Sequence, residues 1–166
     1  EIEEFLDVRK PTGGDINRKS TNLHHGVVIS DQFMALIEGA TREEGFNDSW
    51  DLIDPNSGRV VKTVSAKTLW VKLIQNRVET GEPYIMFGDT VQNGLPECQK
   101  EKGLKVNHSN LCSEITLATD EDRTAVCCLS SVNLEEFDEW QHDPNFIPDL
   151  VAMLDNVLTH FIDKAP

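Results

Sequence analysis

Two short apolar runs, separated by one long helical pattern, constrain the fold of this 166-residue chain more than any other feature. The runs Gly26-Val27-Val28-Ile29 and Pro83-Tyr84-Ile85-Met86-Phe87 are rich in β-branched and aromatic residues, which indicates buried strands. Residues 66–79 lie between them and carry an apolar stripe, with Ser65 as a suitable N-cap and Gly81 as a suitable end. Strands that alternate with helices predict an α/β fold.

Helical patterns occur in three other places, at residues 1–10, 31–38 and 144–163. Ser30 can cap the second of these helices, and Gly39 is expected to stop it. The last helix has an apolar stripe so wide that we expect it to pack on a sheet. Residues 50–64 resemble a hairpin around a turn rich in Asp, Asn and Gly.

A candidate site lies in Asn110-Leu111-Cys112-Ser113-Glu114, where an amide, a thiol and a carboxylate occupy alternate positions. In a strand such side chains share one face at a spacing of about 6.6 Å, so the three would stand in a row about as wide as a sugar ring. Glu114 adjoins apolar Ile115, and burial of its charge would cost several kcal/mol without a partner or a function. We therefore predict a functional site on a strand over residues 111–118.

A second cysteine segment, Ala125-Val126-Cys127-Cys128-Leu129-Ser130, also resembles a strand, whereas the polar stretch 88–108 is a predicted loop. The four cysteines lack the spacing of a disulfide framework, which favours a reducing cytoplasm. Without C-x-x-C or a paired His motif, we expect no metal site. Nothing near His24 and His25 forms a nucleophile elbow, so the pair is read as polar residues at a strand entry. A free cysteine is more often a small buried hydrophobe than a catalyst, and that alternative stays open for Cys112 taken alone.

The net charge of −14, from 29 acids and 15 bases, excludes nucleic-acid binding through a basic surface. The basic residues occur singly, so attraction to a membrane surface is not expected either. No apolar run reaches the roughly 18 residues of a transmembrane helix, and the charged first ten residues do not form a secretory signal. We expect a cytoplasmic protein.

The two cysteine segments resemble the large, catalytic subunit of ribonucleotide reductase. Ser-Asn-Leu-Cys-Ser-Glu-Ile, residues 109–115, is similar to the finger loop of that family, and residues 125–134 are similar to the strand that bears its redox-active cysteine. Three other parts of the chain match the family in the same order. They are the stretch from Asn17 to Val27, residues 81–87, and the terminal helix with its Asp163-Lys164-Ala165-Pro166 ending. The cysteine doublet is closest to the class I enzymes.

The resemblance implies a partial ten-stranded α/β barrel of the ribonucleotide reductase and glycyl-radical type, whose finger loop carries the radical cysteine. Residues 1–166 are then expected to be a fragment of the catalytic barrel domain, truncated at both ends. The phosphate-binding loop, the second cysteine of the reducible pair and the ATP-binding domain of the family have no counterpart here. In this barrel, Asn110, Cys112 and Glu114 are expected at the tip of a loop and not on a plain strand.

The resemblance also assigns roles to residues. Cys112 is the thiyl-radical cysteine that takes the 3′ hydrogen of a ribonucleoside diphosphate, Glu114 is the base for the 3′-hydroxyl proton, and Asn110 holds the sugar. Ser109 and Leu111 join these three as substrate-binding residues. Cys127 supplies one half of the reducing dithiol. Its neighbour Cys128 would face the other side of a strand as a structural residue, and Cys98 has no assigned counterpart.

The resemblance implies that this segment itself binds no cofactor. The radical would come from a di-metal small subunit, or alternatively from adenosylcobalamin in a class II enzyme, and the reducing equivalents from thioredoxin or glutaredoxin. The remaining segments of the large subunit would be needed for activity. Two other functions stay open: a non-catalytic binding module that inherited the fold, and a thiol-redox protein, for which a low pKa of Cys112 or Cys127 is expected.

Overall fold

The computed structural model describes residues 1–165, which fall into two compact units. The first unit comprises residues 1–123 and the second begins at Thr124. Pro166, the last residue of the ending discussed above, lies outside the described residues. Each unit is described by itself.

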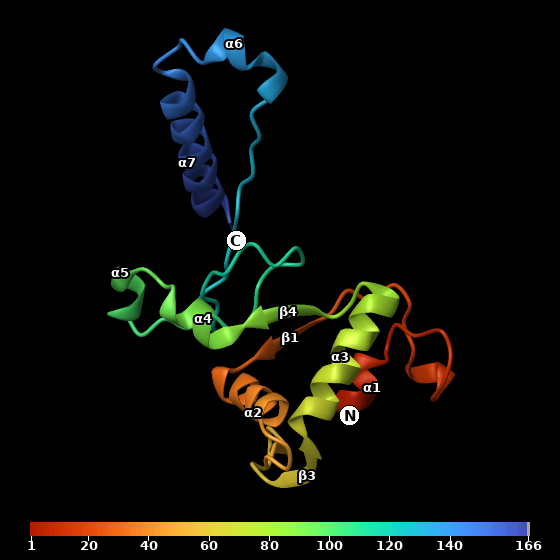
Figure 1. The fold of residues 1–166 in the computed structure, drawn as a ribbon. Coiled ribbons are helices and arrows are strands. Elements are labelled where there is room, and N and C mark those ends of the chain that lie inside the picture. The colour runs from red at the N-terminus through yellow and green to blue at the C-terminus, as the bar shows by residue number, and fades with distance from the viewer. Residues whose placement is uncertain (166) are drawn as a thin grey trace. The chain divides into compact units, whose positions relative to one another are not determined.

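Both predicted strands of the first unit are confirmed, and they pair with each other. β1 (Gly26–Ile29) and β4 (Tyr84–Phe87) run parallel, with Gly26 opposite Tyr84 and Ile29 opposite Phe87 (Figure 1). The predicted helix between them is α3 (Ala66–Thr80). The Ser65 hydroxyl accepts a hydrogen bond from the Thr68 N–H, and Gly81 ends the helix in the left-handed conformation that glycine adopts without a Cβ penalty.

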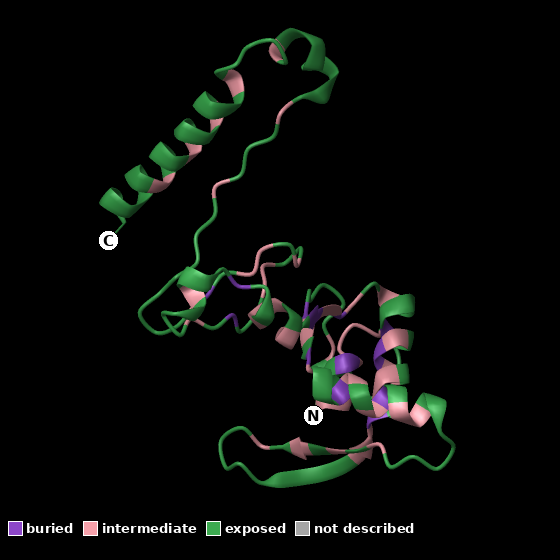
Figure 2. Cartoon of the chain, turned by 60° about the vertical axis from the view of Figure 1, so that its left-hand side comes forward, coloured by how far each residue is buried: buried purple, intermediate pink, exposed green. Residues whose placement is uncertain are grey.

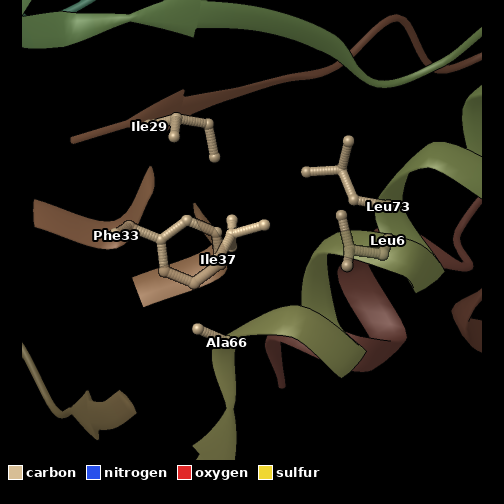
Figure 3. Close-up of a cluster of buried hydrophobic side chains, with 6 residues drawn as sticks. All are labelled: Leu6, Ile29, Phe33, Ile37, Ala66 and Leu73. Atoms are coloured by element: carbon tan, nitrogen blue, oxygen red, sulfur yellow. The ribbon is translucent and has the colours of Figure 1, made fainter. Parts of the chain in front are cut away.

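The hydrophobic core lies on one face of this strand pair, beneath three helices. α1 (Ile2–Leu6), α2 (Asp31–Arg42) and α3 contribute side chains that point toward one another and toward β1 (Figure 3). The buried members are Leu6, Ile29, Phe33, Ile37, Ala66 and Leu73. Buried residues gather in this part of the chain (Figure 2), so the β1–β4 pair and its helices form the stable part of the unit.

Polar contacts join α1 to α3 at the edge of the core. Asp7 accepts hydrogen bonds from Lys72 Nζ at 2.8 Å and from the fully buried Asn76 Nδ2 at 3.0 Å. Burial opposes ionisation of Asp7, but these two hydrogen bonds and the charges of Lys72 and Lys10 outweigh it and lower the pKa of Asp7. A 3₁₀ turn, η1 (Ile16–Arg18), follows α1.

The predicted hairpin is confirmed as β2 (Ser49–Ile53) and β3 (Val60–Ser65), which pair antiparallel. In its turn, the N–H groups of Ser57 and Asn56 donate to Asp54 and lower the pKa of that carboxyl. Trp50 of β2 packs edge-on against Phe33, with ring centroids 5.1 Å apart. The hairpin thereby covers one end of the core.

Two predictions about helices were wrong. α2 does not stop at Gly39 but continues to Arg42, and the Phe46 ring packs so closely on Gly39 that a Cβ there would overlap it. Glycine is used here for close packing inside the helix and not as its end. The stretch 88–108 is not only loop, because it contains α4 (Gly88–Asn93) and α5 (Glu97–Lys100). Its few apolar residues, including Val91, Leu95 and Val106, pack against Met86 on the other face of β4.

The two predicted cysteine strands were also wrong. Within residues 1–165 neither 111–118 nor 125–132 forms a strand, and the nearest pairing is an isolated bridge between Asp120 and Arg123. A period of two in the side chains makes a strand only where a neighbouring strand pairs with its N–H and C=O groups. β1 and β4 pair with each other, and β2 pairs with β3. The described residues are therefore an α/β piece without a closed barrel.

The second unit contains η2 (Leu134–Glu136), α6 (Phe137–Trp140) and α7 (Phe146–Lys164). α7 confirms the predicted final helix. None of its described residues is buried (Figure 2), and its expected packing on a sheet stays a prediction. Trp140 stacks on Phe146 at 5.2 Å and meets Phe137 edge-on at 4.9 Å, which forms the main aromatic contact of this unit.

The β1–β4 pairing leaves no room for a side chain at Gly26, because an added Cβ would overlap the ring of Tyr84. We expect Gly26→Ala to lower the free energy of unfolding by about 1–3 kcal/mol, as overpacking of a filled site does. In a Tyr84→Ala background the same substitution should cost much less, since the overlapping ring is gone. Urea unfolding of the four variants of this double-mutant cycle measures the coupling, and equal losses in both backgrounds would contradict the packing described here.

A buried histidine makes the stability of the first unit depend on pH. His25 is 5% exposed, lies edge-on to Phe5 at 4.8 Å, and neither ring nitrogen has a hydrogen-bond partner. Burial lowers the pKa of His25 below 6.5, against the weaker opposing effects of the Leu23 backbone and of Glu82, and Arg9 makes a small contribution in the same direction as burial. The unfolded chain therefore binds more protons than the folded chain in the interval below pH 6.5.

We expect the free energy of unfolding to decrease as pH falls from 6.5 toward the lowered pKa of His25, and a His25→Phe variant to lose this part of the pH dependence. The matched control is His108→Phe, which changes an exposed histidine of the same unit and should leave the dependence intact. Denaturant unfolding at a series of pH values measures it. Unchanged pH dependence in His25→Phe would show that another group is responsible.

Candidate functional site

The backbone segment that leads to the candidate site is held by Gln92 of α4. Its side-chain amide donates to the Val106 carbonyl at 2.5 Å and accepts from the Val106 N–H at 3.4 Å. Val106 itself is buried with Met86 and Leu95. The chain that leads to Asn110 is thus held on the face of β4 that is opposite the main core.

Asn110 closes the loop that carries Cys112. Its backbone N–H donates to the Ile115 carbonyl at 3.1 Å, and its side-chain oxygen Oδ1 accepts from the Ile115 N–H at 3.0 Å. Its own carbonyl accepts from the Ser113 N–H at 3.1 Å and from the Ser109 hydroxyl at 3.0 Å. Within residues 1–165 the side-chain Nδ2 of Asn110 has no partner, so this group is free to donate to a ligand.

The loop turns at Ser113, which has a φ of 66°. Leu111, Cys112 and Glu114 are exposed around this turn, whereas Ser109 and Asn110 are half-buried. The expected row on a strand face is therefore replaced by a closed turn. The inference that Glu114 is buried at a cost was wrong, because the turn carries its carboxylate into solvent.

The other cysteines lie apart from this loop in the sequence and are free thiols. Cys127 is exposed and belongs to the second unit, and its neighbour Cys128 is half-buried. Cys98 is exposed on α5. The structure thus brings Ser109, Asn110, Leu111, Cys112 and Glu114 together on one loop, and it describes Cys127 separately.

A polar cluster that the sequence reading missed lies at the amino ends of β1 and β4. The Glu82 carboxylate lies 2.8 Å from His24 Nδ1, accepts a hydrogen bond from the Tyr84 N–H at 3.1 Å, and lies 3.7 Å from Arg9. The sequence pattern that could have predicted this cluster is the polar His24-His25 pair before one strand and Glu82 before the other. Because parallel strands begin side by side, these residues lie close together. Ligands of α/β sheets bind at the opposite, carboxyl ends of strands, so we interpret this cluster as structural.

A cavity of about 950 Å³ lies beside the carboxyl end of β1. Ile29, Phe33, Trp50 and Leu52 line it, with Ser30 and Asp89 among the few polar groups. The Asp89 carboxylate already accepts from the Asp31 N–H at 2.7 Å, which ties α4 to the start of α2. Neither Asn110, Cys112 nor Glu114 lines this cavity, and the loop remains the better candidate for chemistry.

Two kinds of feature are absent from the described residues. Among residues 1–165, no group of three or more His, Cys, Asp or Glu side chains is placed to hold a metal ion. No helix in the same range is long and apolar enough to cross a membrane.

Comparison with known proteins gives the family of the chain. A family model described as "Ribonucleotide reductase, barrel domain" matches residues 1–165. The putative ribonucleoside-diphosphate reductase large subunit of Frog virus 3 (isolate Goorha) is 52% identical over 166 residues, covering 100% of this chain and 28% of that protein. The large subunit of Invertebrate iridescent virus 3 is 41% identical over 213 aligned residues, covering 100% of this chain and 34% of that protein.

More distant relatives carry the same kind of name. The ribonucleoside-diphosphate reductase subunit alpha of Chlamydia trachomatis is 31% identical over 184 residues, with 95% of this chain and 17% of that protein covered. The match defines a segment of a barrel domain, and the chain belongs to the ribonucleotide reductase family. The resemblance read from the sequence is confirmed. The chain spans 28% to 34% of the length of the first two relatives.

The closure of the loop by the Asn110 side chain can be tested on this chain directly. We expect Asn110→Ala to speed amide hydrogen exchange at Ile115, because the Ile115 N–H loses its acceptor. Asn110→Asp keeps an acceptor oxygen and should preserve most of the protection. The matched control is Asn107→Ala, which removes only a contact of 3.3 Å to the Thr119 carbonyl. Equal exchange at Ile115 in all variants would contradict the described closure.

Proposed function

We propose that this chain is a segment of the catalytic barrel of a ribonucleoside-diphosphate reductase large subunit, and that its loop around Cys112 takes part in the reduction of ribonucleotides to 2′-deoxyribonucleotides. The observation that carries the proposal is one closed loop in which an exposed thiol lies between an amide with a free donor and an exposed carboxylate. The match over residues 1–165 to the barrel domain supports it, as do the names of the relatives.

Each residue has one chemical task in the proposed reaction. A thiyl radical on Cys112 removes the hydrogen from C3′ of a ribonucleoside diphosphate, so an S–H bond forms and the unpaired electron moves to carbon. Glu114 takes the 3′-hydroxyl proton, and the free Nδ2 of Asn110 donates a hydrogen bond to a ribose oxygen. Ser109 holds the carbonyl of Asn110, and Leu111 adjoins the thiol at the turn.

The replacement of the 2′-hydroxyl by hydrogen, with release of water, needs two electrons and two protons, which a pair of thiols supplies. In the proposal the 2′-hydroxyl leaves as water while Cys127 and a second cysteine outside this chain are oxidised to a disulfide. Thioredoxin or glutaredoxin then returns the disulfide to two thiols. Cys128 and Cys98 have no task in this sequence of steps.

The proposal places the radical source outside this segment. A di-metal small subunit supplies the radical in the class I form that we favour, and adenosylcobalamin supplies it in the class II alternative. The remaining parts of the large subunit would complete the barrel around the loop and bind the diphosphate. Holding the thiol, the base and the donor on one loop contributes orientation, which is the part of catalysis that these residues can provide.

The test is CDP reduction by the large subunit that contains this segment, together with its small subunit. We expect Cys112→Ser to reduce turnover to below a few per cent, since an alcohol does not replace the thiyl radical. The matched control is Cys98→Ser, an exposed cysteine without an assigned task, which should keep full turnover. Turnover of Cys112→Ser well above a few per cent would refute the assignment of the radical to this residue.

Three further arms separate the parts of the proposal. Glu114→Gln should lower the rate strongly, because the amide cannot accept the 3′-hydroxyl proton. Cys127→Ser should abolish repeated turnover with thioredoxin as reductant. Replacing the small subunit by adenosylcobalamin tests the class: turnover under that condition would favour class II, and its absence favours class I.

A further inference from the structure

Within residues 1–165, Ser113 is the only residue other than glycine with a positive φ, at 66°. For L-residues this left-handed region brings Cβ close to the following carbonyl, and serine is not among the residues that adopt it easily. Such outliers persist only where the surroundings hold them, and they occur preferentially at functional sites. This one lies directly between Cys112 and Glu114.

Three hydrogen bonds of the loop hold Ser113 in this conformation. The Ser113 N–H donates to the Asn110 carbonyl at 3.1 Å, and the two bonds between Asn110 and Ile115 close the loop around it at 3.1 and 3.0 Å. No hydrogen bond of the Ser113 hydroxyl contributes to this arrangement within the described residues. What matters at this position is the backbone conformation and not the side-chain oxygen.

The conformation of Ser113 decides how the two neighbouring side chains are related. With extended backbone at residue 113, Cys112 and Glu114 would share one face of a strand and point in the same direction about 6.6 Å apart, because every second side chain lies on the same face. A left-handed residue between them turns the chain and redirects both side chains. The relative direction of the thiol and the carboxylate is therefore set by one dihedral pair at Ser113.

We propose that Ser113 is a positioning residue of the reductase loop, whose left-handed backbone conformation sets the relative direction in which the Cys112 thiol and the Glu114 carboxylate meet the ribose. This inference rests on the proposed function. Ser113 does not touch the reacting atoms, so its substitution affects the rate only through the geometry of its neighbours. Misplacement of reacting groups by a small distance lowers kcat more than it changes substrate binding.

The test compares substitutions that permit a positive φ with one that opposes it. Ser113→Gly and Ser113→Asn remove the hydroxyl but allow the left-handed conformation, whereas the β-branched side chain of Ser113→Val disfavours it. In the large subunit that contains this segment, we expect kcat for CDP reduction to stay within about threefold for Gly and Asn. For Val we expect kcat to fall about tenfold or more, with KM changed less than about twofold.

The backbone is measured independently on this chain. Chemical shifts and the three-bond HN–Hα coupling report φ at residue 113, which should stay positive in the Gly and Asn variants and change in Val. Far-UV circular dichroism and the thermal unfolding midpoint confirm that the Val variant is folded, as expected for an exposed loop. Should Val fail to fold, Ser113→Thr provides the same comparison with a smaller β-branched side chain.

Each outcome decides between the two claims. A φ that is no longer positive in Val or Thr together with the kcat of Gly, or Gly and Asn as impaired as Val, would overturn the positioning role while leaving Cys112 as the radical residue. A positive φ retained in Val together with a tenfold loss of kcat would also overturn it. Turnover in Cys112→Ser, included as a reference, would instead refute the proposed function itself.

Discussion

The parallel pairing of β1 with β4 is the interaction on which the rest of the first unit depends. Its register places Ile29 on the face covered by α1, α2 and α3, and places Met86 on the opposite face, where Leu95 and Val106 cover it. The main core and the second cluster are therefore built on the two sides of the same four-residue strands. Without this pairing neither the crossover through α3 nor the segment that leads to Asn110 would have a surface to pack on.

The loop around Cys112 is held through a chain of contacts that begins at this pairing. Met86 anchors Val106, Gln92 binds the backbone of Val106 in both directions, and Asn110 then closes the turn by binding Ile115. The side chain of Asn110 thus serves a structural purpose with its oxygen and keeps its nitrogen for another partner. An aspartate at this position could accept the hydrogen bond from Ile115, but it could not donate one to a ligand, since a carboxylate has no N–H.

Much of the fold of the first unit could be predicted from the sequence because its signals are local. The strands over Gly26–Ile29 and Tyr84–Phe87, the capping of α3 by Ser65 and its end at Gly81 all follow from residues within one element. The predictions failed where the conformation of a segment depends on packing against another part of the chain. Gly39 lies within a helix because Phe46 packs on it, and the stretch after Phe87 folds into α4 because Val91 reaches the cluster around Met86. The alternation in 111–118 could not form a strand without a paired neighbour.

The residues proposed for the site stay a prediction from the sequence, and the shape of their loop could not be predicted. The order Asn110, Cys112, Glu114 was visible in the sequence, and membership of the ribonucleotide reductase family is confirmed by the match over residues 1–165. The positive φ at Ser113 and the bond from Ile115 to Asn110 could not be predicted, because neither depends on a residue type that marks such a turn. The exposure of Glu114 follows from that turn.

In the proposed reaction, Cys112 begins ribonucleotide reduction by removing the hydrogen at C3′. The most direct measurement is the competition between CDP and CDP deuterated singly at C2′, C3′ or C4′ during reduction by the large subunit that contains this segment. We expect discrimination against deuterium at C3′ and none at C2′ or C4′, because only the C3′–H bond breaks in the step assigned to Cys112. Discrimination at C2′ or C4′ with none at C3′ would contradict it.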